Sequence, residues 1–355
     1  MDFIDEPKPV REGEELDVAS IEKYLASAVP GLSGKLEIAQ FPSGHSNLTY
    51  LIKVGDREMV LRRPPFGRKA KTAHDMGREY RILKALKPHY PYCPEPLAYT
   101  EDESIMGCPF YVMERMRGII LRKELPAGFG ASPEDIRRIY DRVLDVFVEL
   151  HAIDYAQAGL EEFGRPEGYV RRQVEGWSRR YREARTPDVP DFENIMTWLA
   201  EKMPPDHPRH SIVHGDYRID NVVLDPADPM KVIGVLDWEM ATIGDPLMDL
   251  GNSLAYWVEK SDPPNSHLMR LMPTHVEGAP TRMELVARYE EKSGIAIPNF
   301  DYYRCFGLFR LAVIVQQIYY RFYHGQTKDQ RFALFVHGVK ILEEAAAGVI
   351  EGSAL

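Results

Sequence analysis

Three polar residues between positions 212 and 249 are of types that could do chemistry, and each lies next to a short aliphatic run. Asp216 follows one run, Asn221 precedes the next, and Asp237 follows a third. This pattern predicts oxygen ligands at the ends of buried strands. Two carboxylates and an amide are hard oxygen donors that suit Mg²⁺ bound together with phosphate. A carboxylate that accepts a hydroxyl proton, with an Asn and an Asp on a metal ion, is the set of groups that phosphoryl transfer requires.

The elements that must position these residues change character along the chain. Alternating apolar residues predict antiparallel strands at 36–41, 48–54 and 59–61, with Gly55-Asp56 as a hairpin turn. A helix at 74–86 and two more strands up to residue 114 follow. Beyond residue 118 the apolar spacing becomes helical. The predicted helices there cover 132–151, 169–184, 191–201, 250–258, 283–293, 301–323 and 329–350.

Composition limits the class of protein. The chain has 355 residues, 44% hydrophobic and 28% charged, which predicts one large domain or two lobes. Its net charge of -10 argues against nucleic acid as a partner. The three cysteines, Cys93, Cys108 and Cys305, show no metal-ligand spacing, so we interpret them as reduced intracellular thiols.

Targeting and membrane signals are weak. The acidic first six residues do not resemble a signal peptide. The apolar segment at 305–320 is too short to span a bilayer, and Arg310 interrupts it. We therefore expect a cytoplasmic protein without a membrane partner. Arg310, on an apolar helix face, is predicted to be a structural ion-pair partner.

Two strings carry a family resemblance. H-G-D-Y-R-I-D-N-V-V-L-D begins at His214, and V-L-D-W-E-M-A-T-I-G-D-P-L-M-D-L begins at Val235. They resemble the aminoglycoside phosphotransferase and choline kinase-like family, most closely the branch of phosphotransferase domains fused to acyl-CoA dehydrogenases. The resemblance implies an α+β, two-lobed protein-kinase-like fold. Its small antiparallel-sheet N-lobe would span residues 1–116, and its larger, mainly helical C-lobe 117–355.

The resemblance also implies roles for the central residues. Asp216 would be the general base, and Arg218 would contact the transferred phosphate. Arg218 could instead pair with Asp220 or Glu239. The metal ligands would be Asn221 and Asp237. A further residue, His214, would hold the loop through Asp245 or Asp249.

In the N-lobe the resemblance implies a nucleotide site. Arg62 would grip phosphates, with Arg63 as the alternative because the strand register is open by one residue. Glu79 would orient this cation, unless it pairs in solvent with Arg78 or Lys84. The remaining nucleotide contacts would come from a covering loop and a hinge. They are Ser43, Gly44, His45, Ser46 and Asn47 in the loop, and Met113, Glu114 and Met116 in the hinge.

These expectations amount to an ATP- and Mg²⁺-dependent kinase that phosphorylates a hydroxyl of a small molecule. The dehydrogenase-linked branch favours a hydroxyacyl-CoA-type acceptor. The basic helix at 169–184, with Arg172 and Arg179, favours an anionic acceptor, although its face could simply be solvated. Segment 261–282 could be a lid over the acceptor. The alternatives are an antibiotic kinase and a catalytically silent nucleotide-binding regulator, and a homodimer is left open.

Overall fold

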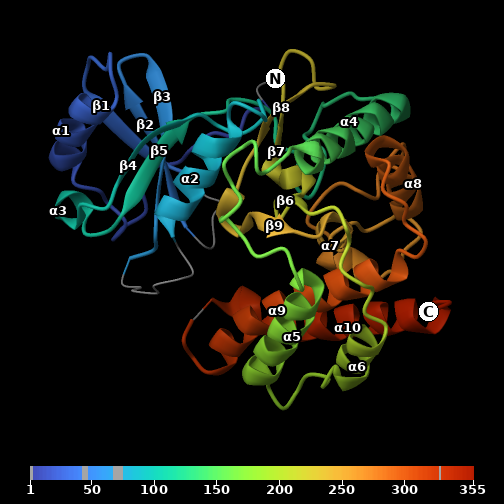
Figure 1. Ribbon diagram of the computed structural model, residues 1–355. Helices are drawn as coiled ribbons and strands as arrows, with labels where there is room; N and C mark the ends of the chain where they lie inside the picture. The colour runs from blue at the N-terminus through green and yellow to red at the C-terminus, as the bar shows by residue number, and fades with distance from the viewer. Residues whose placement is uncertain (1–2, 42–46, 67–74, 328) are drawn as a thin grey trace. The chain divides into compact units, whose positions relative to one another are not determined.

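The computed structural model describes residues 3–41, 47–66, 75–327 and 329–355 (Figure 1). The chain forms two compact units. The first contains Met1–Ile120 and Asn221–Ala241, and the second contains Leu121–Asp220 and Thr242–Leu355. Residues 221–241 lie beyond the sequence-based boundary at residue 116, yet they group with the first unit. Within that unit, Leu224 forms a β-bridge with Ile119, and the amide of Val235 donates to the Tyr92 carbonyl oxygen.

The first unit is built on a five-stranded antiparallel sheet with the strand order β1-β2-β3-β5-β4. The strands are β1 (Leu36–Gln40), β2 (Leu48–Val54), β3 (Arg57–Arg63), β4 (Pro96–Thr100) and β5 (Phe110–Glu114). The predicted hairpin turn lies between β2 and β3, where Val54 pairs with Arg57.

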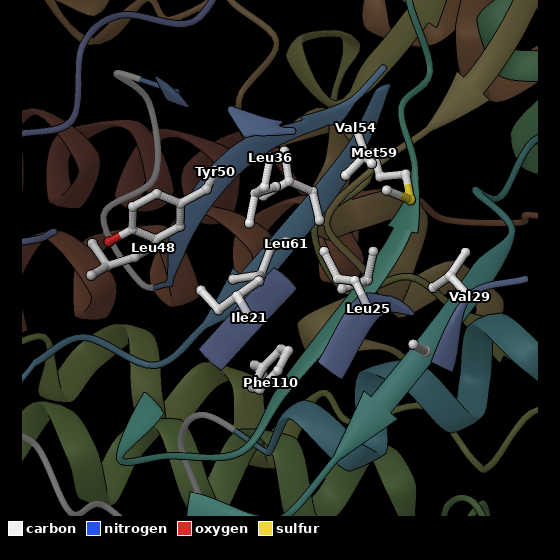
Figure 2. Close-up of a cluster of buried hydrophobic side chains, with 13 residues drawn as sticks. Ile21, Leu25, Val29, Leu36, Leu48, Tyr50, Val54, Met59, Leu61 and Phe110 are labelled. Carbon is white, nitrogen blue, oxygen red and sulfur yellow. The ribbon is translucent and has the colours of Figure 1, made fainter. Parts of the chain in front are cut away.

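One face of this sheet is covered by α1 (Val18–Ala28), which begins at its N-cap Asp17. Figure 2 shows Ile21 and Leu25 of this helix in one buried cluster with Leu61 and Phe110 of the sheet. Successive side chains of a strand point to opposite faces. Because Leu61 faces α1, its neighbour Arg62 faces the other side, toward α2 (Met76–Leu86). The short helix α3 (Glu103–Met106) precedes β5.

The rest of the first unit is a hairpin of β7 (Val222–Leu224) and β8 (Val232–Val235), followed by the 3-10 helix η2 (Trp238–Met240). Trp238 is buried, and its indole ring lies edge-on to Tyr90 at 5.8 Å. Val222 pairs with Val235, so the residue before β7 and the residues after β8 lie at the same end of the hairpin.

The second unit is mainly helical. Its helices are α4 (Pro133–Ala152), α5 (Tyr169–Ala184), α6 (Glu193–Glu201), α7 (Pro246–Leu254), α8 (Arg282–Ser293), α9 (Asp301–Tyr323) and α10 (Phe335–Gly352). The 3-10 helices are η1 (Ile219–Asn221), which runs into the first unit, η3 (Ser266–Met269) and η4 (Gln330–Leu334). A two-stranded ladder joins β6 (Ser211–Val213) to β9 (Thr242–Gly244). The predicted α+β fold is thereby confirmed.

Helix α9 is the centre of the second unit, because α5, α6, α7 and α10 all pack against it (Figure 1). It meets α7 at two glycines. A Cβ on Gly251 would lie 2.3 Å from the Tyr303 carbonyl oxygen, and one on Gly307 would lie 2.2 Å from the Gly251 carbonyl oxygen. The two helices can therefore approach this closely only without side chains at these positions. In the described part of the chain, no helix is long and apolar enough to cross a membrane.

Candidate functional site

An ion network in the first unit brings together four of the predicted site residues: Arg62, Glu79, Asp237 and Asn47. Arg62 on β3 donates from Nη1 to Glu79 Oε1 on α2 at 2.5 Å. Its Nη2 donates to Asp237 Oδ1 at 3.0 Å and lies 3.6 Å from Glu239 Oε2. Arg62 and Glu79 are 7% and 2% exposed, so the solvated pairing considered for Glu79 is wrong.

Burial and charge oppose each other in this network. Burial raises the pKa of Glu79, and the neighbouring Arg62 counters that rise. For Arg62 burial acts to lower the pKa, but Glu79, Asp237 and Glu239 raise it well above its ordinary value. The guanidinium therefore stays charged and holds three carboxylates together. Asn47 joins the network by donating from Nδ2 to Glu239 Oε2 at 2.7 Å.

The two predicted metal ligands lie at one end of the β7–β8 hairpin. The amide of Leu236 donates to the Asn221 carbonyl oxygen at 2.8 Å, which places Asn221 beside the residue before Asp237. Asp237 has a φ of 68°, a left-handed conformation that is uncommon outside glycine. Its side chain is 33% exposed, and the hydrogen bond from Arg62 uses only Oδ1.

The chemistry of these donors fits a hard cation. Carboxylate and amide oxygens are what Mg²⁺ takes from proteins, and it completes its octahedron with water and phosphate oxygens. Across the described ranges there is no group of three His, Cys, Asp or Glu side chains placed to hold a metal. That part of the chain therefore holds no metal site built from such side chains alone. Asn221 and Asp237 suit a site in which phosphate oxygens and water supply the other ligands.

The predicted hinge is the segment that leaves β5. Met113 is buried, and the Glu114 carboxylate accepts hydrogen bonds from Lys87 and from the amide of Glu95. The amide of Met116 donates to none of the residues that the structure describes. It can therefore donate to a ligand. The predicted covering-loop residues Ser43, Gly44, His45 and Ser46 lie outside the described residues, and Asn47 is placed as above.

In the second unit, Arg218 lies between two carboxylates. Its Nε is 3.3 Å from Asp216 Oδ1 and 3.4 Å from Asp220 Oδ1. The guanidinium also lies over the Tyr256 ring, 4.6 Å from the centroid. Burial raises the pKa of Asp220, with Arg218 opposing the rise. The predicted pairing with Asp220 is therefore present, alongside a pairing with the predicted base.

The backbone before Asp216 is fixed by a buried carboxylate on α7. Asp249 accepts hydrogen bonds from the amides of His214 and Gly215 at 2.7 and 2.9 Å. His151 Nε2 lies 3.2 Å from Asp249 Oδ2, and its Nδ1 lies 2.7 Å from the Tyr289 hydroxyl. Burial acts to raise the pKa of Asp249, but the hydrogen bond from His151 and the loop amides lower it overall. Of the two acids considered for His214, Asp249 is therefore the one that accepts hydrogen bonds from the backbone of this loop.

One expectation for the second unit is corrected. Arg310 is not an ion-pair partner: within the described residues no carboxylate lies within 4.0 Å, and Nη2 donates instead to the Gly215 carbonyl oxygen at 2.7 Å. His151, which the sequence analysis did not single out, contacts Asp249. Arg172 donates to the carbonyl oxygens of Glu167 and Arg165, in the segment that precedes α5.

Comparison with known proteins decides the family. A model of the phosphotransferase enzyme family matches residues 37–280. This chain belongs to that family. The match includes both strings of the sequence analysis, the Arg62 network, and Asp249 with His151, His214 and Gly215.

Curated relatives of this phosphotransferase carry acyl-CoA dehydrogenase names. Acyl-CoA dehydrogenase family member 10 of Mus musculus is 37% identical over 325 residues, which cover 91% of this chain and 30% of that protein. Family member 11 of Gallus gallus is 34% identical and covers 94% of this chain and 44% of that protein. The phosphotransferase thus spans less than half the length of these relatives.

Solved structures confirm the protein-kinase-like phosphotransferase fold. A Ralstonia eutropha protein, provisionally named an aminoglycoside phosphotransferase, is 29% identical with a TM-score of 0.80 and covers 96% of this chain and 100% of its own. The aminoglycoside phosphotransferase APH(2")-IIIa, solved with GDP and kanamycin, is 16% identical with a TM-score of 0.61 and covers 92% of this chain and 98% of its own. At that identity the second likeness concerns the fold alone.

Proposed function

We propose that this phosphotransferase moves the γ-phosphate of ATP to a hydroxyl group of a small molecule, with Mg²⁺ as its cofactor. The observation that carries the proposal is the buried Arg62 cation, held by Glu79 and directed at Asp237, whose second carboxylate oxygen remains available. A structural role alone does not explain why a charged network of this kind includes a strained, partly exposed Asp.

The first unit would bind the nucleotide. Arg62 would hold the α- and β-phosphates through its guanidinium, while the hinge amide of Met116 would contact the base. Asn221 and Asp237 would hold the metal. Bound there, Mg²⁺ would neutralise charge on the phosphate oxygens and so favour departure of ADP.

The second unit would supply the proton acceptor. The acceptor hydroxyl oxygen forms a bond to the γ-phosphorus as the bond from that phosphorus to the β–γ bridging oxygen breaks. Asp216 would take the hydroxyl proton, and Arg218 would stabilise negative charge on the transferred group. The hydrogen bonds that Asp249 accepts from the loop support these roles because they fix the backbone from which Asp216 projects.

We favour a hydroxyacyl-CoA-type metabolite as the acceptor, since the curated relatives carry acyl-CoA dehydrogenase names and extend well beyond the part that this chain matches. The aminoglycoside phosphotransferases among the structural neighbours support an antibiotic as the second candidate. A cytoplasmic location and a homodimer remain predictions.

A screen of hydroxylated metabolites and antibiotics for an ATP-dependent gain of one phosphate, read by mass spectrometry, tests the proposal. We expect Asp216→Asn and Asp237→Asn each to lower turnover by roughly 10²–10⁴-fold, the usual contribution of a general base or a metal ligand. Asp56→Asn, in the exposed β2–β3 turn, is the matched control. The protein would be a silent regulator if it binds nucleotide, transfers phosphate to no compound and shows no ATP hydrolysis that depends on Asp216.

A further inference from the structure

Arg310 on α9 is a buried cation with no counter-charge among the residues that the structure describes. Its residue surface is 5% exposed, and among the described residues no acid lies within ion-pairing distance. Only Nη2 is satisfied, by the Gly215 carbonyl oxygen at 2.7 Å. The Nε and Nη1 atoms make no hydrogen bond to the described chain and are not among its fully enclosed polar atoms, so they still reach solvent. A guanidinium has five N–H donors, and most of these remain unused.

A second cation lies beside it on α5. The Arg310 guanidinium is 5.2 Å from the centre of the Trp177 ring, and that of Arg180 is 4.5 Å from the same ring. Arg180 likewise forms no ion pair with any described residue. Its pKa is lowered by burial first and then by the positive charges of Arg179 and Arg310. Two like charges therefore gather around one indole ring.

This arrangement costs stability in the free protein. Buried charges normally pair with opposite charges, and an uncompensated one is expensive. The indole face and a single carbonyl oxygen offset part of that cost. Such costs are commonly retained where a site serves a function. An anion brought by a ligand would complete the site.

The position of the site relates it to catalysis. The carbonyl oxygen that Arg310 contacts belongs to Gly215, the residue directly before the proposed base, Asp216. An anionic group bound by Arg310 would therefore be held close to the loop that carries Asp216.

We infer that Arg310, Arg180 and Trp177 form the binding site for an anionic group of the acceptor, a carboxylate or a phosphate, in the second unit. The inference rests on the proposed function and narrows its acceptor to hydroxylated anions. It also assigns anion binding to residues other than Arg172 and Arg179, which the sequence indicated. Arg179 is highly exposed, and its Nε lies 4.0 Å from Glu183 Oε1. Arg172 donates to the backbone carbonyl oxygen of Glu167.

The first test measures binding directly and does not need turnover. The chain has four tryptophans, so the protein is labelled with 5-fluorotryptophan, and the Trp177 resonance is assigned with Trp177→Phe. Inorganic phosphate and acetate are titrated separately. We expect at least one of them to shift this resonance saturably. The arm that responds identifies the preferred anion.

Three variants show whether Arg310 is responsible. Arg310→Gln removes the charge but keeps a donor for the Gly215 oxygen, and we expect it to abolish the shift. Arg310→Lys keeps the charge and should retain a weaker shift. Arg179→Met, on the exposed face of α5, should behave as wild type. A shift that persists in Arg310→Gln, or no shift with either anion, overturns the inference.

Thermal unfolding without any anion separates a binding role from a structural one. Because an unpaired buried charge is removed, Arg310→Gln should melt at or above the wild-type temperature. Adding the responding anion should raise the melting temperature of wild type and not that of the variant. A variant that melts well below wild type would show that Arg310 is structural, and the inference would be wrong.

The second test uses turnover and distinguishes this inference from the proposed function. Hydroxylated acids that the screen identifies are compared with their neutral amides. We expect kcat/KM to favour the acid by roughly 30-fold or more, chiefly through KM, and Arg310→Gln to remove that preference. Equal turnover of acid and amide would refute the anion site while phosphotransfer itself stands. ATP transfer to no compound, together with an Arg310-dependent shift of Trp177, would refute the proposed function and leave the anion site.

Discussion

Replacing Arg62 with Met should expose the electrostatic cost of the network in a pH-dependent way. The variant removes the only cation seen within 4 Å of Glu79 among the described residues and leaves that carboxylate buried at 2% exposure. Breaking a buried pair by removing one partner usually costs about 3–5 kcal/mol. Glu79 can avoid part of this cost by taking up a proton.

The protonation route sets the expected magnitude. Burial raises the pKa of Glu79, and without Arg62 the rise is larger. Keeping the carboxyl neutral at pH 7 against its ordinary value of 4.5 costs about 3 kcal/mol of unfolding free energy. The folded variant then binds a proton that its unfolded chain has released, so its stability falls as the pH rises. The deficit against wild type should be small near pH 4.5 and grow by about 1.4 kcal/mol per pH unit.

The assay must report on the first unit, because the two units need not unfold together. Native-state hydrogen exchange of β3 and β5, read by mass spectrometry from pH 5 to 7.5, supplies opening free energies there. Arg57→Met, on the exposed end of the same strand, is the matched control and should stay within about 0.5 kcal/mol of wild type.

A double variant, Arg62→Met with Glu79→Met, completes the argument. Removing both buried charges should restore most of the lost stability and abolish the pH dependence. A deficit below about 1 kcal/mol at pH 7, a deficit that does not change with pH, or no rescue in the double variant would each refute the reasoning.

Two further predictions concern the second unit. Gly307→Ala places a Cβ 2.2 Å from the Gly251 carbonyl oxygen, so it should lower the free energy of unfolding by roughly 1–3 kcal/mol. Gly348→Ala, on α10 with open space around it, should raise the free energy of unfolding by up to about 1 kcal/mol. Urea unfolding measures both, and equal effects would contradict the close crossing of α7 and α9. Asp249→Asn should cost roughly 3 kcal/mol at pH 7, since one amide oxygen cannot replace two carboxylate oxygens. Because the pKa of Asp249 is lowered from 3.8, the advantage of wild type should be complete above that pH and disappear as the pH falls below it. A difference that persists in strong acid would contradict the role of these hydrogen bonds.

The family resemblance implied the Arg62–Glu79 contact, and it could be carried over to these positions because both residues lie in regular elements. The choice between Arg62 and Arg63 could not, since a one-residue change of register exchanges the two faces of a strand. The buried cluster on the α1 face settles it: Leu61 lies there, so Arg62 points toward α2. Arg63 instead places its guanidinium 3.7 Å from the centre of the Phe66 ring.

The contacts that the sequence did not reveal join residues far apart in the chain. Glu239 meets Asn47 from 192 positions away, and Arg310 meets Gly215 from 95 positions away. His151 and Asp249 are separated by 98 positions. Periodicity and spacing describe one element at a time, so they cannot reveal which elements pack together. The sequence pattern around a buried Arg also does not distinguish whether its partner is an acid, an indole or a ligand.

Residues 261–282, which the sequence analysis considered as a lid, also make contacts that composition does not reveal. Their proline and glycine content suggested a loose cover for the acceptor. In the structure Thr274 is buried; its hydroxyl accepts a hydrogen bond from the Val258 amide and donates one to the Val258 carbonyl oxygen. Trp257 Nε1 donates to the Pro280 carbonyl oxygen. Arg282 binds both oxygens of Asp262. These contacts anchor the two ends of the segment, which composition alone does not show.

The chain passes between its two units at residues 120, 220 and 241, and this discontinuity restricts how the protein can be divided. A fragment ending at residue 116 lacks Asp237 and Glu239, so Arg62 would lose two of its three carboxylates. Neither unit is therefore a module that a gene could gain or lose by a single cut. Divergence of acceptor preference in this family is accordingly expected to proceed by substitution and loop insertion within 121–220 and 242–355, and not by exchange of one unit for another.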